Sequence, residues 1–139
     1  MRPVVFDSDL YIDWIETGLH QELMLDRSLI RYMSTVVLLE LQAGALTTAS
    51  ADAVSDLYKI FGRTGRLLVP SAETYWRAGS VLRALQARHG INVRRRFRLA
   101  NDCLIALSAR QIGATLLTRN VRDYKLIREV TPFAFIAVP

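Results

Sequence analysis

Short apolar runs alternate with helical segments along this chain, and that alternation constrains the fold more than any other feature. Runs of β-branched, aromatic or other apolar residues predict strands at 4–6, 34–37, 67–69, 114–118 and 133–138. Helical spacing of apolar residues predicts helices at 10–16, 21–32, 38–44, 51–60, 71–88, 101–111 and 123–128. Strands joined through helices need crossover connections. The pattern therefore predicts an α/β fold in which helices flank a mainly parallel central sheet on both faces.

Length and composition favour one compact unit. The chain has 139 residues, of which 51% are hydrophobic and 22% charged, and this supports a well-filled core. We therefore expect a single domain over residues 1–139. No continuous apolar run approaches the roughly 18 residues that a membrane span needs, and Asp7 comes too early for the apolar region of a secretory signal. We expect a cytoplasmic protein with no membrane partner.

The charge balance and the cysteine usage narrow the chemistry. The net charge of +5 comes mostly from arginine, whose planar fork matches phosphate oxygens. A polyanionic partner would suit this balance, although many basic proteins bind no nucleic acid. Cys103 is the only cysteine, which excludes an internal disulfide and a cysteine-cluster metal site. We expect it to be a small buried core residue.

Four acids follow or flank the predicted strands. They are Asp7 after the first strand, Glu40 about a turn beyond the second, Asp102 in the first turn of its helix, and Asp123 shortly after the 114–118 strand. Ligands gather beyond the carboxyl ends of parallel strands, and acids packed together there repel one another unless protons or cations neutralise them. Hard oxygen donors without histidine or cysteine select Mg²⁺ or Mn²⁺. Such an ion activates water for hydrolysis of a phosphodiester.

Each acid also has an explanation that needs no catalysis. Glu40 can lie on a solvated helix face, Asp102 can be an acid stabilised by a helix N-terminus, and Asp123 can be a surface turn residue. Of the four acids, Asp7 most favours a functional interpretation, because an acid directly after an apolar run is unusual for a strand end. Pattern alone leaves both explanations open.

Three motifs, taken together, carry a family resemblance. Residues 4–12 have the sequence VVFDSDLYI, residues 36–41 have VVLLEL, and NDCLIA at 101–106 precedes GATLLTRNVRDY at 113–124. In order and spacing these segments resemble the four acidic motifs of PIN-domain ribonucleases, in the form found in the VapC toxins of VapBC toxin–antitoxin systems. The resemblance covers nearly the whole chain, and its last stretch is the most specific.

The resemblance implies an α/β/α PIN-like domain and a Mg²⁺- or Mn²⁺-dependent endoribonuclease. It implies the toxin of a type II toxin–antitoxin pair, with RNA as substrate, a small antitoxin protein as partner, and a homodimer. Carried over by position, the catalytic and metal-binding residues would be Asp7, Glu40, Asp102 and Asp123. Ser8, Thr118 and Asn120 match polar positions beside the acids, where they would orient the acids or the attacking water.

Asp9 departs from the family pattern. It stands where the family often has Ser, Thr or Asn. Two interpretations stay open: Asp9 adds a fifth acid to the metal site, or it points away as a turn residue.

Arginines near the third and fourth motifs are candidates for RNA binding. They are Arg94, Arg95, Arg96, Arg98 and Arg119. The first four form a basic run just before the predicted 101–111 helix, where they could grip phosphates beside the metal site. The same run could equally be a solvated loop or a partner for acidic groups of the antitoxin.

Two other functions compete with the nuclease. Asp7-Ser8-Asp9 also resembles the opening DxD motif of haloacid-dehalogenase-type phosphatases, but Tyr11 stands where that family usually has Thr or Val, and no lysine followed by a paired-acid motif appears downstream. The second alternative is a catalytically inactive PIN-like module that binds RNA or protein. The presence of all four acids argues against it.

Overall fold

The computed structural model describes residues 2–139, which form five strands and seven helices. The strands are β1 (Arg2–Phe6), β2 (Leu29–Ser34), β3 (Leu67–Leu68), β4 (Thr115–Thr118) and β5 (Phe135–Ala137). The helices are α1 (Ser8–Thr17), α2 (Gln21–Leu25), α3 (Thr35–Gly44), α4 (Thr48–Arg63), α5 (Ala72–His89), α6 (Phe97–Gln111) and α7 (Val121–Arg128). The predicted α/β class is confirmed, and every strand pairing is parallel.

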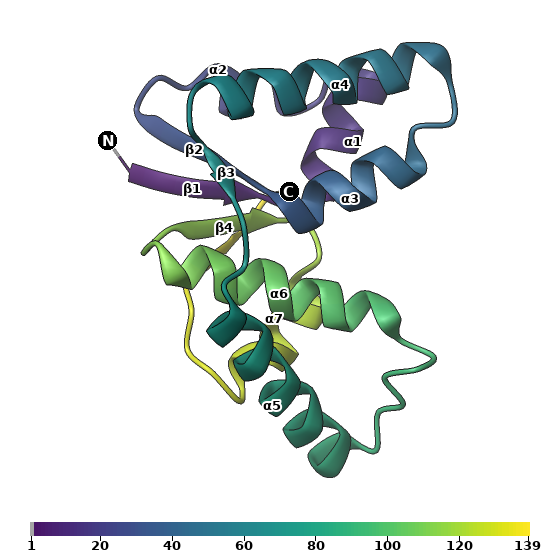
Figure 1. Ribbon diagram of the computed structural model, residues 1–139, viewed down its shortest axis with the longest axis vertical. Helices are drawn as coiled ribbons and strands as arrows, with labels where there is room; N and C mark the ends of the chain where they lie inside the picture. The colour runs from purple at the N-terminus through teal and green to yellow at the C-terminus, as the bar shows by residue number, and fades with distance from the viewer. Residues whose placement is uncertain (1) are drawn as a thin grey trace.

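The sheet has the strand order β3-β2-β1-β4-β5. The chain builds outward from β1 to β2 and β3, then returns to add β4 and β5 on the other side of β1. Right-handed crossovers therefore place α1–α4 on one face and α5–α7 on the other. Figure 1 shows these two groups of helices in the upper and lower halves of the molecule. The order reverses between β1 and β4, and such a switch point is where open parallel sheets place their ligands.

The central strands are buried on both faces, as parallel strands usually are. Val4, Val5 and Phe6 are all buried, and so is Leu116 on the neighbouring β4. Each side chain of this size removed from water contributes roughly 1.5–3 kcal/mol. The carboxyl ends of β1 and β4 are therefore held by the best-packed part of the molecule.

The second strand differs from the prediction. We expected a helix over 21–32 and a strand over 34–37, whereas the helix α2 stops at Leu25, β2 occupies Leu29–Ser34, and α3 starts at Thr35. The Ser34 side chain explains the helix start, because its hydroxyl accepts hydrogen bonds from the backbone N–H groups of Val36 and Val37. A serine N-cap of this kind outweighs the strand preference of the following β-branched residues.

Several helices begin earlier than predicted, and α4 and α6 are two of those that differ by three residues or more. The helix α4 begins at Thr48 rather than 51, behind a capping box formed by Thr47 and Ser50. The helix α6 begins at Phe97 rather than 101. Asp102 therefore lies in the second turn of α6 and not in its first, so a helix N-terminus does not explain its presence. No helix within residues 2–139 is long and apolar enough to cross a membrane.

Candidate active site

Asp7 lies at the switch point, at the end of β1. Its backbone N–H donates to the carbonyl of Leu117 on β4 (2.9 Å). Its carboxylate caps the start of α1, with Oδ1 accepting from the N–H of Ser8 (2.9 Å), while Oδ2 accepts from the hydroxyl of Thr118 (2.7 Å). Only 3% of Asp7 is exposed. Two strands and one helix N-terminus thus fix this acid in the interior.

Asp102 is the second buried acid, only 1% exposed. It projects from α6 and accepts two hydrogen bonds, one on each oxygen. Asn120 Nδ2 lies 3.3 Å from Oδ2, and the hydroxyl of Tyr124 lies 3.3 Å from Oδ1. The same Asn120 amide donates to Asp123 Oδ2 at 3.2 Å. One side chain after β4 therefore bridges acids on α6 and α7.

Glu40 joins the group from α3. Its negative charge contributes to raising the pKa of both Asp7 and Asp102. Its Oε1 atom is buried and has no hydrogen-bond partner among residues 2–139. A buried oxygen left without a donor is costly, and this one lies near other acids.

The four predicted acids thus influence one another across four segments of the chain. Burial raises the pKa of Asp102 to about 8, helped by the charges of Asp7, Asp123 and Glu40. Burial also raises the pKa of Asp7 to about 6, with Asp9 as the next largest cause. Burial and like charges both disfavour the ionised carboxylate. The site therefore holds protons more tightly than ordinary acids do, and it favours any cation that can replace them.

The structure distinguishes the two interpretations of Asp9. Its Oδ2 accepts from the backbone N–H of Arg119 at 2.9 Å and from the Thr118 hydroxyl at 3.5 Å. Its Oδ1 is buried and has no partner among residues 2–139. Asp9 lies within α1, beside Asp7, and does not point away as a turn residue.

The polar residues named beside the acids reach them in different ways. Thr118 contacts Asp7, and its oxygen also accepts from the backbone N–H of Asn120 (2.9 Å). Asn120 bridges Asp102 and Asp123, as described above. The contact of the buried Ser8 with Asp7 comes from its backbone N–H rather than from its hydroxyl.

Arg96 contacts one of the four acids directly. Its guanidinium is 2.7 Å from Asp123 Oδ1, a charge-assisted contact. The basic run was predicted either to grip phosphates beside the site or to be a solvated loop or an antitoxin contact. Arg94 and Arg95 lie exposed in the turn that precedes α6, which is compatible with each of these. Arg98 is exposed within the first turn of α6, and its positive charge lowers the pKa of Asp102.

Arg119 points to a different acid. Its guanidinium lies 2.7 Å from Asp13 Oδ2, and the same oxygen lies 2.9 Å from the Nε2 atom of His20. Its backbone N–H, as noted, supports Asp9. The guanidinium of Arg119 is thus engaged by Asp13 at the edge of the acid group. It can bind a phosphate only if this ion pair breaks.

The donor chemistry of the site fits a hard divalent cation. The available ligands are carboxylate oxygens, joined by one amide, and these suit Mg²⁺ or Mn²⁺. A positive charge would stabilise the unpartnered oxygens of Asp9 and Glu40. It would also stabilise the ionised form of Asp102, whose pKa is raised. Within residues 2–139 no three acid, histidine or cysteine side chains already stand close enough to hold an ion. Three of these side chains would have to come closer together to hold an ion jointly.

Two contacts of this site were missed from the sequence. They are the ion pair between Arg96 and Asp123 and the hydrogen bond from Tyr124 to Asp102. Tyr124 directly follows Asp123 in the most specific motif, and that position was a usable signal. Arg96 offered none, because a basic run before a helix does not indicate which arginine turns inward.

A comparison with protein-family models identifies the family of this chain. The model of the PIN domain matches residues 4–129, almost the full length of the chain. The chain belongs to the PIN-domain family. PIN domains are typically nucleases, so the family supports a hydrolase that acts on nucleic acid. The match includes residues 7–9, on which the phosphatase alternative rested.

Solved structures show the same fold. VapBC2 from Rickettsia felis, bound to a DNA fragment from its promoter, matches with a TM-score of 0.68 and 21% identity over 99% of both chains. VapBC-5 from Mycobacterium tuberculosis matches with a TM-score of 0.66 and 22% identity, covering 99% of this chain and 100% of that one. VapBC-1 from nontypeable Haemophilus influenzae gives 0.66 and 20% over 97% of both chains. No curated protein matches by sequence.

Proposed function

We propose that this PIN domain is a metal-dependent endoribonuclease and the toxin of a type II toxin–antitoxin pair. The observation that carries the proposal is the convergence of Asp7, Glu40, Asp102 and Asp123 at the switch point of the sheet, with the pKa of Asp102 raised to about 8. A set of buried acids that repel one another costs stability unless it has a use. Binding a divalent cation is the use that fits oxygen donors.

The roles of the side chains follow from their contacts. Asp7 and Asp102, with Glu40 and Asp123, would hold Mg²⁺ or Mn²⁺, directly or through water, and Asp9 would add a further oxygen. Thr118 would keep Asp7 oriented, and Asn120 would keep Asp102 and Asp123 at a fixed separation. A bound cation would supply an activated water and neutralise charge that develops on the phosphate.

Arginines would supply the affinity for the RNA backbone. Arg94 and Arg95 are exposed beside the acids' arginine partner, Arg96, and would contact phosphates outside the scissile bond. Arg98 and Arg119 would contribute at the two sides of the acid group. The ion pair between Arg96 and Asp123 would have to break when a cation binds to Asp123.

The partners and the setting are part of the same proposal. Solved complexes of similar fold include VapBC systems, and we infer a small cognate antitoxin that covers this site. We also propose a homodimer of single-domain chains acting in the cytoplasm. Expression of the chain alone should arrest growth, and co-expression of a small protein encoded beside it should restore growth.

Cleavage of purified total RNA tests the nuclease. We expect discrete fragments with wild-type protein and Mg²⁺ or Mn²⁺, and none with EDTA or with Asp7→Asn. Cleavage that persists in EDTA would contradict the metal requirement. RNA binding without cleavage, under both metals and with several RNA pools, would favour the inactive binding module instead.

A further inference from the structure

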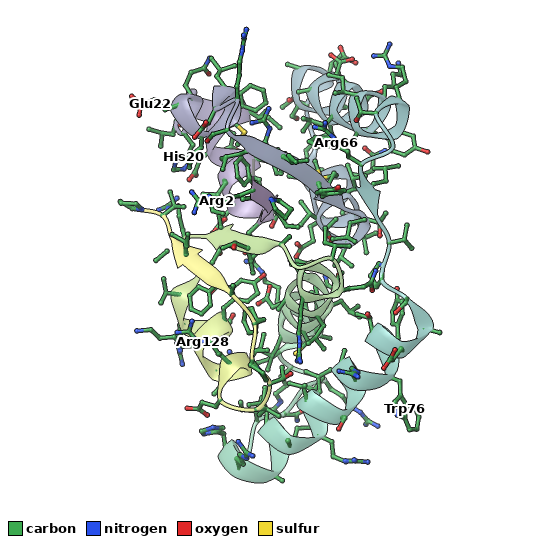
Figure 2. The ribbon with its side chains drawn as sticks, turned by 90° about the vertical axis from the view of Figure 1, so that its left-hand side faces the viewer. Arg2, His20, Glu22, Arg66, Trp76 and Arg128 are labelled. Atoms are coloured by element: carbon green, nitrogen blue, oxygen red, sulfur yellow. The ribbon has the colours of Figure 1, made fainter. Side chains whose placement is uncertain are left out.

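Tyr124 lies beneath the acid group without belonging to it. Its side chain is 0% exposed, and its ring packs against two aromatic residues near the last strand. The ring centres of Phe133 and Phe135 both lie 6.1 Å from that of Tyr124. Arg128 closes this aromatic cluster from outside, with its guanidinium carbon 4.3 Å from the centre of the Phe135 ring; Figure 2 shows it beside the last strand. The ring of Tyr124 is therefore held in one place.

The hydroxyl of this fixed ring points to the acids. It donates to Asp102 Oδ1 at 3.3 Å. A phenolic hydroxyl is a neutral O–H donor, and this one is placed to donate to the carboxylate.

Asp102 is consequently held on both oxygens. Asn120 donates to one and Tyr124 to the other. The two donors come from different segments, the turn after β4 and the helix α7, so together they fix the rotation of the carboxylate.

We propose that Tyr124 is a positioning residue that orients Asp102 and keeps it ready to bind the divalent cation. The inference rests on the proposed function and adds a residue to it. Residues that support metal ligands by hydrogen bonds typically change metal affinity or activity by 10–100-fold when removed. The hydroxyl of Tyr124 should act in the same way, whereas its ring serves only packing.

Tyr11 offers a matched control. It is also a buried tyrosine, 1% exposed, and its hydroxyl has no hydrogen-bond partner among residues 2–139. Tyr11→Phe and Tyr124→Phe therefore remove the same atom from the interior of the same protein. Only the second removes a contact with an acid of the site.

Calorimetric titration of the metal-free protein with Mn²⁺ tests the proposal. We expect Tyr124→Phe to weaken Mn²⁺ binding about 10-fold, and Tyr11→Phe to bind as the wild type does. RNA cleavage by Tyr124→Phe should be slow at low Mn²⁺ and should recover when the Mn²⁺ concentration is raised about 10-fold, with the KM for RNA unchanged. A merely structural role would not give this rescue.

The Asp102→Asn variant distinguishes a failure of the Tyr124 proposal from a failure of the metal site. If the wild type binds Mn²⁺, Asp102→Asn does not, and Tyr124→Phe binds as the wild type does, the role of Tyr124 is overturned and the metal site stands. If Asp102→Asn and the wild type bind Mn²⁺ alike, or neither binds it, the metal site fails and the role of Tyr124 fails with it. An equal loss of affinity in Tyr11→Phe would also overturn the proposal, because the effect would then come from the loss of a buried hydroxyl anywhere.

Discussion

At the scale of single residues, the acids of this protein are held at a cost to the fold. Asp7 and Asp102 are nearly inaccessible, and neither has a direct cationic partner among its hydrogen bonds. The one ion pair with an acid of the group among residues 2–139, that of Arg96, is made with Asp123 instead. The metal-free molecule therefore carries electrostatic strain that protons or a cation relieve.

Replacing Asp102 by Asn should separate activity from stability. RNA cleavage should fall by at least about 100-fold, as expected when a catalytic group is misplaced, while the Tm of the metal-free protein at pH 8 should rise because a repulsive charge is removed. Thermal unfolding and a cleavage assay measure both effects. Asp52→Asn changes an exposed acid on α4 and serves as control. A variant that loses activity together with Tm would indicate a structural role for Asp102.

The pKa shifts also predict how stability depends on pH. Because the pKa of Asp7 is raised to about 6 and that of Asp102 to about 8, the folded state binds more protons than the unfolded state between about pH 4 and 8. Stability of the metal-free protein should therefore fall as pH rises through this window. We expect the Tm to be higher at pH 5 than at pH 8 by at least about 5 °C.

Saturating Mn²⁺ should flatten that dependence, since a cation replaces the protons. In contrast, a Tm that rises steadily from pH 5 to pH 8 without metal would contradict the assigned shifts. The Asp102→Asn variant should show a weaker dependence on pH than the wild type.

The sequence predicted that these acids meet at one edge of the sheet, and it predicted less about their surroundings. Acids placed after strands of a parallel sheet must meet at one edge, so their convergence follows from topology alone. The contacts of Arg96 and Tyr124 depend on side-chain rotamers and on how α7 packs against α6, which no local pattern encodes. The orientation of Asp9 likewise follows from a backbone N–H of Arg119 that only the fold brings near.

At the scale of elements, tertiary contacts override local preference in one segment. Residues 29–33 continue a helical apolar spacing, yet they form β2 because their backbone pairs with β1 on one side and β3 on the other. The strand expected at 34–37 is the start of α3, and a serine N-cap was a signal available from the sequence. The remaining strands were predicted at nearly their observed positions because their flanking turns are clear.

The turn before α6 should carry part of the RNA affinity. Replacing Arg94 and Arg95 together by Ala should weaken binding and reduce the slope of log K against log salt by about 1.4, since each lost contact to single-stranded phosphate accounts for about 0.7. Fluorescence anisotropy at several salt concentrations measures this slope.

The control is the pair Arg2→Ala and Arg27→Ala, two exposed arginines at the opposite edge of the sheet. They should leave the slope nearly unchanged. Equal slopes for both double variants would indicate that the basic turn is a solvated loop without a role in RNA binding. Arg96→Ala should behave differently from both, lowering the Tm of the metal-free protein because Asp123 loses its ion pair.

At the scale of the whole molecule, five parallel strands with one switch point bring acids from four segments to one edge of the sheet. The chain carries a net charge of +5, and Arg96 and Arg119 contact acids at this edge. Such a balance attracts a polyanion to a molecule whose acids can still take a cation. The same fold recurs in VapBC structures at about one-fifth identity. The fold is thus shared, and the activity of this chain depends on the site that it carries.

The proposed homodimer belongs to this scale as well. Light scattering on the purified chain should give twice the monomer mass of 15.7 kDa. A mass that stays at the monomer value over a wide range of protein concentrations would contradict the dimer, and it would leave the metal site untouched.

The most direct test of the central claim is the anomalous scattering of Mn²⁺ in crystals of the wild-type protein soaked with the ion. We predict a peak bounded by the carboxylates of Asp7 and Asp102, with the side chain of Arg96 displaced from any acid that binds the ion, and no such peak in Asp102→Asn. Crystals that take up Mn²⁺ only elsewhere, with these acids still apart, would contradict it.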